Sequence, residues 1–297
     1  MFDFRLQVFY TVAKRLNFTR AAEELCITQP AVTKHIHELE AYFKVKLLDR
    51  KGNKTLLTAA GETLLQQTEA LQLLYRNMEF EMSAHVRKHK GQLRIGASTT
   101  VAQYVLPQVL AAFRKKFPDI TVSLTTGNTE QTERALEHRE IDLGVIEGHS
   151  RKAQVRYTEF IRDELVLVSR VQNPLAAKAS ISAEELKQIP LLLREPGSGT
   201  LEVLAHALKP LHIKTGDLKK EMQLSSTESI KRYLLHSDSM AFVSIYAVLK
   251  ELELRECCVI DVTGLDINRH FYFIEPQGQT PALPALFKRF ALRYNFR

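Results

Sequence analysis

Two short segments decide the fold of the N-terminal part of the chain: Phe18-Thr19-Arg20-Ala21-Ala22 and Thr28-Gln29-Pro30-Ala31-Val32-Thr33-Lys34-His35. Thr19 and Thr28 are suitable N-caps, because a threonine hydroxyl can accept a hydrogen bond from a free backbone N–H at the start of a helix. Apolar residues at helical spacing follow each cap, and they also recur between Phe4 and Leu16. The sequence therefore predicts three helices, the last two joined by a tight turn as in a helix-turn-helix.

The helix after Thr28 has one apolar side and one side that is free to contact a partner. Its predicted buried stripe consists of Val32, Ile36, Leu39 and Phe43. The second helix of a helix-turn-helix enters the major groove of DNA, where glutamine can pair with adenine and threonine or proline can pack on a thymine methyl. Nearby cations and the helix N-terminus would contact phosphates. The predicted DNA-binding residues are Arg20, Thr28, Gln29, Pro30, Thr33, Lys34, His37, Arg50 and Lys54.

The segment that follows predicts a wing and a long helix. Residues 47–50 and 54–58 suit two short strands around the turn Lys51-Gly52-Asn53. From Ala59 to about Lys88 there is no proline, and apolar residues repeat every seventh position, as on a helix that pairs with another helix. A helix of this length that packs only on its own domain is the alternative. The predicted dimerisation residues are Leu64, Leu71, Tyr75, Met78 and Met82.

Gly91 marks the start of an α/β pattern, in which short apolar strands alternate with helices. The predicted strands cover residues 93–97, 120–125, 142–146, 165–169, 191–193 and 271–274. The predicted helices cover residues 101–117, 130–139, 201–211 and 228–236, with another at the C-terminus. Several strands end in hydroxyl-rich segments, namely Ser98-Thr99-Thr100, Thr126-Gly127-Asn128 and Pro196-Gly197-Ser198-Gly199-Thr200. Because α/β sheets bind ligands beyond the carboxyl ends of their strands, a small carboxylate or other oxyanion fits these segments best.

Composition and missing motifs narrow the class of protein. The chain of 297 residues has a net charge of +7, which favours a polyanionic partner such as nucleic acid or an acidic membrane surface. No apolar run is long enough to cross a membrane, and the three cysteines Cys26, Cys257 and Cys258 form no disulfide framework, so we expect a cytoplasmic protein without a membrane partner. No phosphate loop, nucleophile elbow or zinc-protease motif occurs, so we expect neither an enzyme nor a cofactor or metal.

Taken in order, these segments closely resemble the LysR-type transcriptional regulators over the whole chain. The most specific matches are Phe18-Thr19-Arg20-Ala21-Ala22, Thr28-Gln29-Pro30-Ala31-Val32-Thr33, Leu39-Glu40, Leu47-Leu48-Asp49-Arg50 and Leu57-Thr58-Ala59-Ala60-Gly61. The resemblance implies an α/β chain with an N-terminal winged helix-turn-helix (1–58), a linker helix for dimerisation (59–90) and a two-lobed effector domain similar to periplasmic binding proteins (91–297). Lobe I would comprise residues 91–162 and 267–297, and lobe II residues 163–266.

The resemblance also implies that an effector binds between the two lobes. Carried over by position, the effector-binding residues are Ser98, Thr99, Thr100, Asn128, Ser198, Thr200 and Ser244. Two turns depart from the family pattern: Lys44 stands where glycine is usual, and Ser237-Asp238-Ser239 replaces a glycine-containing turn. A lysine at position 44 would cost free energy if the backbone kept left-handed geometry.

The sequence therefore predicts a sequence-specific DNA-binding regulator, a homodimer or homotetramer that binds double-stranded DNA and a small, anionic effector and affects access of RNA polymerase. Three alternatives stay open. The first is a regulator that responds to oxidation of Cys257 and Cys258. The others are a DNA-binding protein without sequence preference, and a small-molecule-binding protein or enzyme whose N-terminal helices are only structural.

Overall fold

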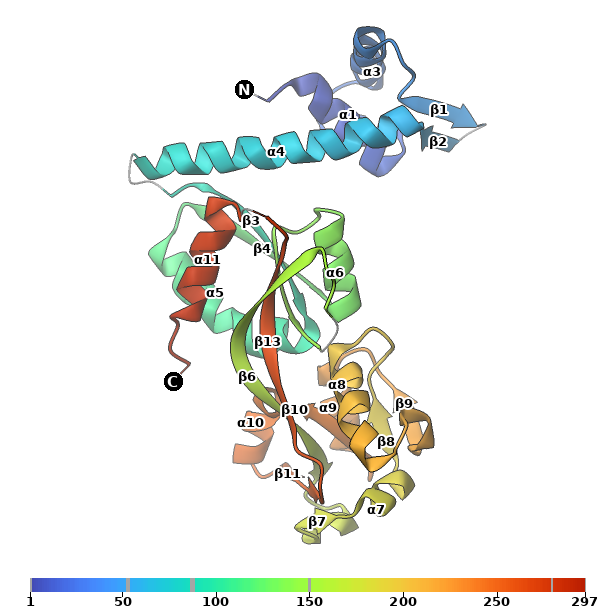
Figure 1. Cartoon of the computed structure of the whole chain (residues 1–297), viewed down its shortest axis with the longest axis vertical. Helices are drawn as coiled ribbons and strands as arrows, with labels where there is room; N and C mark the ends of the chain where they lie inside the picture. Colours follow the sequence, from blue (N-terminus) through green and yellow to red (C-terminus); the bar gives the residue numbers. More distant parts are fainter. Residues whose placement is uncertain (1, 52–53, 86–88, 149–150, 279, 297) are drawn as a thin grey trace. The chain divides into compact units, whose positions relative to one another are not determined.

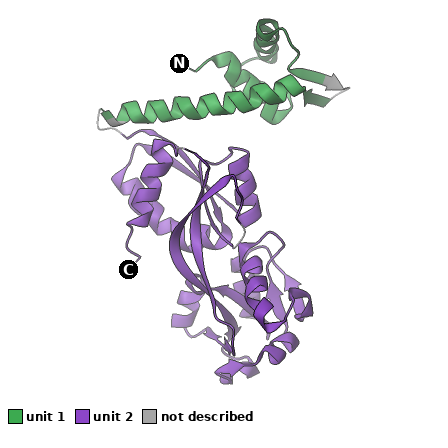
Figure 2. Cartoon of the chain, in the orientation of Figure 1, with its two compact units in different colours: residues 1–88 green, residues 89–297 purple. Residues whose placement is uncertain are grey.

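The computed structural model describes residues 2–51, 54–85, 89–148, 151–278 and 280–296. The chain divides into two compact units, unit 1 (Met1–Lys88) and unit 2 (His89–Arg297), drawn in different colours in Figure 2. Each unit is considered by itself. No helix among the described residues combines the length and apolar character that a membrane span needs.

Unit 1 consists of three short helices, a two-stranded wing and a long helix. Its elements are α1 (Phe4–Arg15), α2 (Phe18–Glu24), α3 (Gln29–Phe43), β1 (Leu48–Lys51), β2 (Lys54–Leu57) and α4 (Ala59–His85). Thr28 caps α3 as predicted, since its side chain accepts a hydrogen bond from Ala31 N. The predicted cap Thr19 is wrong: the N-cap of α2 is Asn17, two residues earlier, and its Oδ1 accepts from Arg20 N at 3.0 Å. Asparagine is a better N-cap than threonine, and it precedes the threonine in the chain.

The apolar sides of α1, α2 and α3 form the core of unit 1. Val32, Ile36 and Leu39 are buried in it as predicted, but Phe43 is 44% exposed. The buried residue in the last turn of α3 is Glu40, whose Oε1 accepts from the backbone N–H of Leu47 at 2.9 Å. The chain entering the wing thus needs a hydrogen-bond acceptor at this position, and a carboxylate supplies it.

The turn after α3 keeps left-handed geometry although it contains no glycine. Lys44 has φ +56° and donates its backbone N–H to Glu40 O. Left-handed residues commonly end helices because they satisfy the last carbonyl groups. Gly61 is required for a different reason: a Cβ there would overlap the carbonyl oxygen of Leu47, so only glycine allows α4 to pack this close to the wing.

Unit 2 contains one large mixed sheet with helices around it (Figure 1). The strands of the main path are β3 (Gly91–Ser98), β4 (Ile120–Gly127), β5 (Leu143–Glu147), β6 (Val155–Arg170), β8 (Leu191–Leu193), β9 (Lys220–Gln223), β10 (Met240–Ser244) and β13 (Ile267–Pro276). Their spatial order is β4-β3-β5-β13-β6-β10-β8-β9, and β11 (Cys257–Val259) pairs with β6. Two short strands, β7 (Ser180–Ile181) and β12 (Asp261–Val262), form a separate pair.

The helices of unit 2 follow the strands as in other α/β domains. They are α5 (Leu106–Lys116), α6 (Thr129–Glu137), α7 (Ala183–Gln188), α8 (Gly199–Leu208), α9 (Thr227–Leu234), α10 (Ile245–Glu253) and α11 (Ala282–Leu292). A π-helical turn over Val101–Val105 precedes α5, so the predicted single helix over 101–117 is interrupted at its start. The helices predicted over 130–139, 201–211 and 228–236 correspond to α6, α8 and α9, with ends that differ by a few residues.

The two long antiparallel strands β6 and β13 connect two lobes of unit 2 (Figure 1). We call lobe I the part built on β3, β4 and β5, and lobe II the part built on β8, β9 and β10. One end of β13 pairs with β5 of lobe I, while the lobe II half of β6 pairs with β10. The sequence predicted only short strands over 165–169 and 271–274, because the polar residues of both crossing segments hide their continuity.

Candidate functional site

The N-terminal turn of α3 presents the residues that were predicted to contact bases. Thr28, Gln29 and Pro30 are exposed, and Thr33 is half-buried. Gln29 Nε2 donates to Thr33 Oγ1 at 3.0 Å, and that hydroxyl donates to Gln29 O at 3.2 Å. One hydrogen bond therefore joins the two side chains that could pair with base edges, and they would exchange this bond for bonds to DNA.

The predicted phosphate contacts are spread over three elements of unit 1. Arg20 on α2, Lys34 on α3 and Lys54 on β2 are exposed, and Lys34 Nζ lies 3.9 Å from Glu38. His37 is exposed and its Nδ1 lies 3.4 Å from Glu40. The side chain of Arg50 lies outside the described residues.

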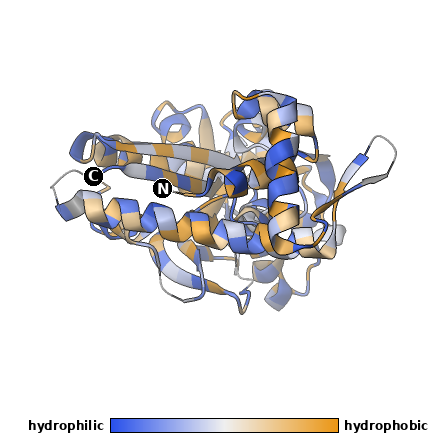
Figure 3. Cartoon of the chain, turned by 90° about the horizontal axis from the view of Figure 1, so that it is seen from above, coloured by the Kyte–Doolittle hydropathy of each residue, from blue (hydrophilic) through white to orange (hydrophobic). Residues whose placement is uncertain are grey.

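Apolar residues recur along α4 (Figure 3), and several of them are exposed. Leu71, Met78 and Met82 are 48%, 50% and 62% exposed. The other two residues of the predicted dimerisation set are partly buried within unit 1: Leu64 packs against its core, and the Tyr75 ring lies 6.2 Å from that of Phe2.

Ser98 and Glu147 lie at the carboxyl-end edge of the lobe I sheet. They end the neighbouring parallel strands β3 and β5, so the topology brings both side chains to the same edge of the sheet. Ser98 Oγ donates to Glu147 Oε2, and both residues are about 1% exposed. The hydroxyl of Thr129, at the start of α6, donates to the carbonyl oxygen of Glu147 at 2.7 Å.

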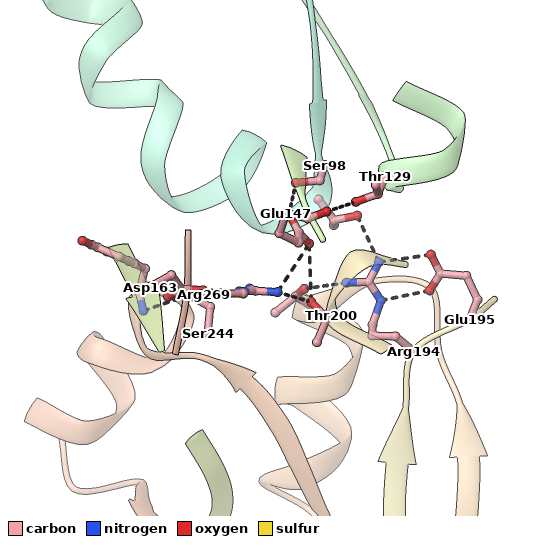
Figure 4. A network of polar contacts seen from close by, with 12 residues as sticks. Ser98, Thr129, Glu147, Asp163, Arg194, Glu195, Thr200, Ser244 and Arg269 are labelled. Atoms are coloured by element: carbon pink, nitrogen blue, oxygen red, sulfur yellow. Dashed lines mark hydrogen bonds and ion pairs between the residues drawn. The ribbon is translucent and has the colours of Figure 1, made fainter. Parts of the chain in front are cut away.

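Lobe II meets this edge through α8 and β13 (Figure 4). Thr200, in the first turn of α8, donates to Glu147 Oε1 at 3.4 Å and accepts from Arg269 Nη1 at 3.1 Å. Arg269 Nε donates to Asp163 Oδ2 at 2.6 Å, and Ser244 Oγ donates to Asp163 Oδ1 at 2.6 Å. The ends of β3, β5 and β10, the N-termini of α6 and α8, and both crossing strands thus contribute to one buried polar network.

A second group of charged side chains, next to the contacts of Glu147 and Arg269, also joins the two lobes. Arg194, which follows β8, donates from Nη2 to Thr99 Oγ1 of lobe I at 3.2 Å and is paired with Glu195. Asn128, the N-cap of α6 in lobe I, donates from Nδ2 to Glu195 Oε1 at 3.2 Å. We call these contacts and those of the preceding two paragraphs the cleft network.

The structure buries all seven residues that were predicted to bind an effector. Five of them are hydrogen-bonded within the cleft network, namely Ser98, Thr99, Asn128, Thr200 and Ser244. Thr100 is buried at the start of the π-helical turn, where its side chain makes no capping bond. Ser198 is the N-cap of α8 without a side-chain capping bond, and its Oγ is buried with no hydrogen-bond partner. Arg269 Nη2 is buried without a partner as well.

The sequence analysis missed the charged members of the network, Glu147, Asp163, Arg194, Glu195 and Arg269. Glu147 comes directly after the strand predicted over 142–146, so the rule that selected Ser98 could have found it. Arg269 lies two residues from both Ile267 and Phe271, and this spacing places the arginine on the same inward face of the strand as these apolar residues. No comparable local signal marks Asp163 or Arg194.

A groove of about 450 Å³ adjoins the cleft network between α6 and α8. Thr129 and Ser198 lie at its wall together with three acidic side chains, Glu130, Glu133 and Glu202. In the described part of the chain, no three His, Cys, Asp or Glu side chains are arranged to hold a metal ion. The groove leaves room for a small molecule beside the network.

Comparison with known proteins gives matches over both units. The profile described as "Bacterial regulatory helix-turn-helix protein, lysR family" matches residues 4–62, and that described as "LysR substrate binding domain" matches residues 87–294. The HTH-type transcriptional regulator CysL of Bacillus subtilis (strain 168) is 32% identical over 269 residues, which are 91% of this chain and 89% of that protein.

Two solved structures have similar folds. The regulatory domain of CcmR from Synechocystis PCC6803, in complex with 2-PG, has a TM-score of 0.62 and 26% identity, and the match covers 68% of this chain and 95% of that chain. Full-length CbnR complexed with its target DNA has a TM-score of 0.66 and 22% identity, covering 97% of this chain and 98% of that chain.

Proposed function

Because the chain belongs to the LysR family of bacterial transcriptional regulators, we propose that it uses α3 to recognise a DNA sequence and the cleft network to bind a small anionic effector. In this assignment the domain of residues 1–58 binds DNA. The helix of residues 59–90 links the two domains and forms the dimer, and the domain of residues 91–297 binds the effector. The protein acts in the cytoplasm, where its DNA lies, and alters access of RNA polymerase without catalysing a reaction.

The observation that carries the effector proposal is the pair of buried donors without partners. A buried polar group without a hydrogen bond costs about 1–3 kcal/mol, so such groups point to a missing partner. Arg269 Nη2 belongs to a residue of the cleft network, and Ser198 Oγ lies at the N-cap of α8, two residues before Thr200. Each can donate to an acceptor oxygen. The 2-PG complex of the CcmR regulatory domain supports an oxyanion as the partner.

The base-reading part of the proposal is tested by DNA capture. The purified protein is incubated with sheared DNA from its source, and the bound fragments are recovered and sequenced. We expect enrichment of sites with dyad symmetry, and loss of this enrichment in Gln29→Ala because the bidentate contact to a base is removed. Gln7→Ala changes an exposed glutamine on α1 and is the matched control. If Gln7→Ala recovers DNA fragments as uniformly as Gln29→Ala, without enrichment of any site, sequence-specific binding is contradicted.

The effector part is tested by ligand-dependent DNA release. Operator binding is titrated with a panel of small oxyanions that includes 2-PG, in the wild type and in Ser198→Ala. We expect at least one anion to change the affinity for DNA, and we expect the serine variant to need more of it because a donor is lost. If no anion of the panel changes DNA binding or the melting temperature, the effector assignment is wrong.

The exposed apolar side of α4 supports dimerisation through this helix. A helix of 27 residues with Leu71, Met78 and Met82 largely exposed has apolar surface that a second α4 can cover. Met78→Glu should shift sedimentation toward the monomer at micromolar concentration, since it places a charge in the seam. Gln66→Glu adds a charge at an exposed polar position away from the apolar side of the same helix and should leave the dimer intact.

A further inference from the structure

The carboxylate of Glu147 occupies the point at which the two lobes meet. Ser98 of lobe I donates to it, and Thr200 of lobe II donates to its Oε1 at 3.4 Å, while Arg269 Nη1 lies 4.0 Å away (Figure 4). The side chain is 2% exposed, and its backbone is fixed by the pairing of β5 with β13. A carboxylate of the chain itself thus joins donors from both lobes.

The charges around Glu147 leave it as the excess anion of the network. Arg269 is already paired with Asp163 at 2.6 Å, and Arg194 with Glu195 at 2.9 Å. Three carboxylates therefore face two guanidinium groups. A further anion placed beside Glu147 would add a second unpaired negative charge in a buried site, where like charges repel strongly. The neighbouring groove does not compensate this negative charge, because its wall contains three glutamates.

The groups around Glu147 nevertheless form a site for an oxyanion. Thr200 lies in the first turn of the ten-residue helix α8, and a helix N-terminus stabilises negative charge. Ser198, at the N-cap of the same helix, and Arg269 each have a buried polar atom without a hydrogen-bond partner. The network thus has more donor capacity than the Glu147 carboxylate uses.

We propose that Glu147 is an internal competitor of the effector: a compact oxyanion, such as a carboxylate, sulfate or phosphate group, binds by taking the place of its carboxylate between Ser98, Thr200 and Arg269. This inference depends on the proposed function, in which the cleft binds an anion. For a monoanionic group the local charge stays unchanged, provided that the Glu147 side chain rotates away from the donors as the ligand binds. The exchange also selects for ligands with two or more acceptor oxygens on one centre, because donors from both lobes must be satisfied at once.

Inorganic sulfate is a suitable probe, because it is a compact oxyanion without an organic part. Its binding to the full chain is measured by calorimetry, together with the rise in melting temperature. Glu147→Gln removes the charge and keeps the size of the side chain, so we expect sulfate to bind at least about tenfold more tightly than to the wild type. Glu147→Ala empties the position and should show a gain as well. If one of these two variants folds poorly, the sulfate affinity of the other tests the proposal.

Two controls separate charge from other effects of substitution. Glu147→Asp keeps the negative charge and should show no gain, and Glu253→Gln makes the same chemical change at an exposed position of α10. If Glu147→Gln and Glu147→Ala bind sulfate no better than the wild type, the competitor role is wrong, even if anions release DNA from the wild type. A gain in both variants, with no response of wild-type DNA binding to any anion, would support the competitor role and contradict the proposed regulation.

Discussion

Arg269 and Asp163 are directly opposite each other on the two crossing strands, and Arg269 Nε donates to Asp163 Oδ2 at 2.6 Å. Both side chains are almost completely inaccessible to solvent. A buried ion pair is weak evidence for stability, but removal of one partner leaves an uncompensated charge. This pair therefore fixes the position from which Arg269 reaches Thr200 and the Glu147 carboxylate.

Substitution of Arg269 should destabilise unit 2 more than simultaneous substitution of both partners. Arg269→Met leaves the carboxylate of Asp163 buried, with Ser244 as its remaining side-chain donor among the described residues. We expect a loss of about 3–5 kcal/mol in the free energy of unfolding. The double variant Arg269→Met with Asp163→Asn should recover part of this loss. Urea unfolding followed by circular dichroism provides the values, and equal losses in both variants would contradict the argument.

The buried carboxyl of Glu40 should make the stability of unit 1 depend on pH. Burial opposes its ionisation, but the backbone N–H groups of Leu47 and Leu48 and the ammonium of Lys46 outweigh burial and lower the pKa of the carboxyl below its ordinary value of 4.5. A group with a lowered folded-state pKa contributes stability above its unfolded pKa, and this contribution disappears as the pH falls through the folded value. Unit 1 should therefore lose stability below about pH 4.5.

The matched variant for this prediction is Glu40→Gln, which cannot ionise. It should be less stable than the wild type near neutral pH, and the difference should shrink as the pH falls toward 3, at roughly 1.4 kcal/mol per unit of pKa difference. Thermal unfolding at a series of pH values measures the difference. A constant difference over this range would show that the charge of Glu40 has no part in it.

The fold of unit 1 and the sheet edge of lobe I could be predicted from sequence because local patterns determine them. Helical spacing located α3, and the strand-end rule located Ser98 and Asn128. The pairing of Arg269 with Asp163 could not be predicted, because it depends on the register of two strands about a hundred residues apart, of which only the apolar ends were predicted. Phe43 was misplaced because periodicity alone does not show where a helix leaves its core.

The cysteine pair of β11 should not act as a redox switch. Burial, with Glu251 nearby, raises the pKa of the Cys257 thiol to about 11, and burial raises that of Cys258. Since the thiolate is the reactive form, Cys257 should react about a hundredfold more slowly than an ordinary thiol. Exposed Cys26 is the expected first site of alkylation by iodoacetamide at neutral pH.

Mass spectrometry of timed alkylation checks this order. The double variant Cys257→Ser with Cys258→Ser should keep the response of DNA binding to anions and should not acquire or lose sensitivity to peroxide. If peroxide changes DNA binding of the wild type and the double variant no longer responds, the redox alternative is favoured over an anionic effector.

A tyrosine of lobe I should control how easily the lobes separate. Tyr104 Oη donates to Glu228 on α9 of lobe II, and Lys231 lies 3.0 Å from Glu228 and 2.8 Å from Glu251. Burial and the Glu228 carboxylate raise the pKa of Tyr104, so its hydroxyl stays a donor at neutral pH. Tyr104→Phe removes this bond between the lobes. Loss of a hydrogen bond to a charged group, roughly 1.5 kcal/mol, should increase the open population about tenfold.

Hydrogen exchange at the backbone N–H of Glu130 reports this opening, because that group donates across the lobes to Gly197 O at 3.1 Å. Exchange should accelerate about tenfold in Tyr104→Phe, as expected for loss of a bond to a charged acceptor. Tyr233→Phe is the matched control, since Tyr233 Oη donates to Glu221 at 3.4 Å within lobe II. Equal exchange rates in Tyr104→Phe and the wild type would mean that other contacts, such as Asn128 with Glu195, hold the lobes together.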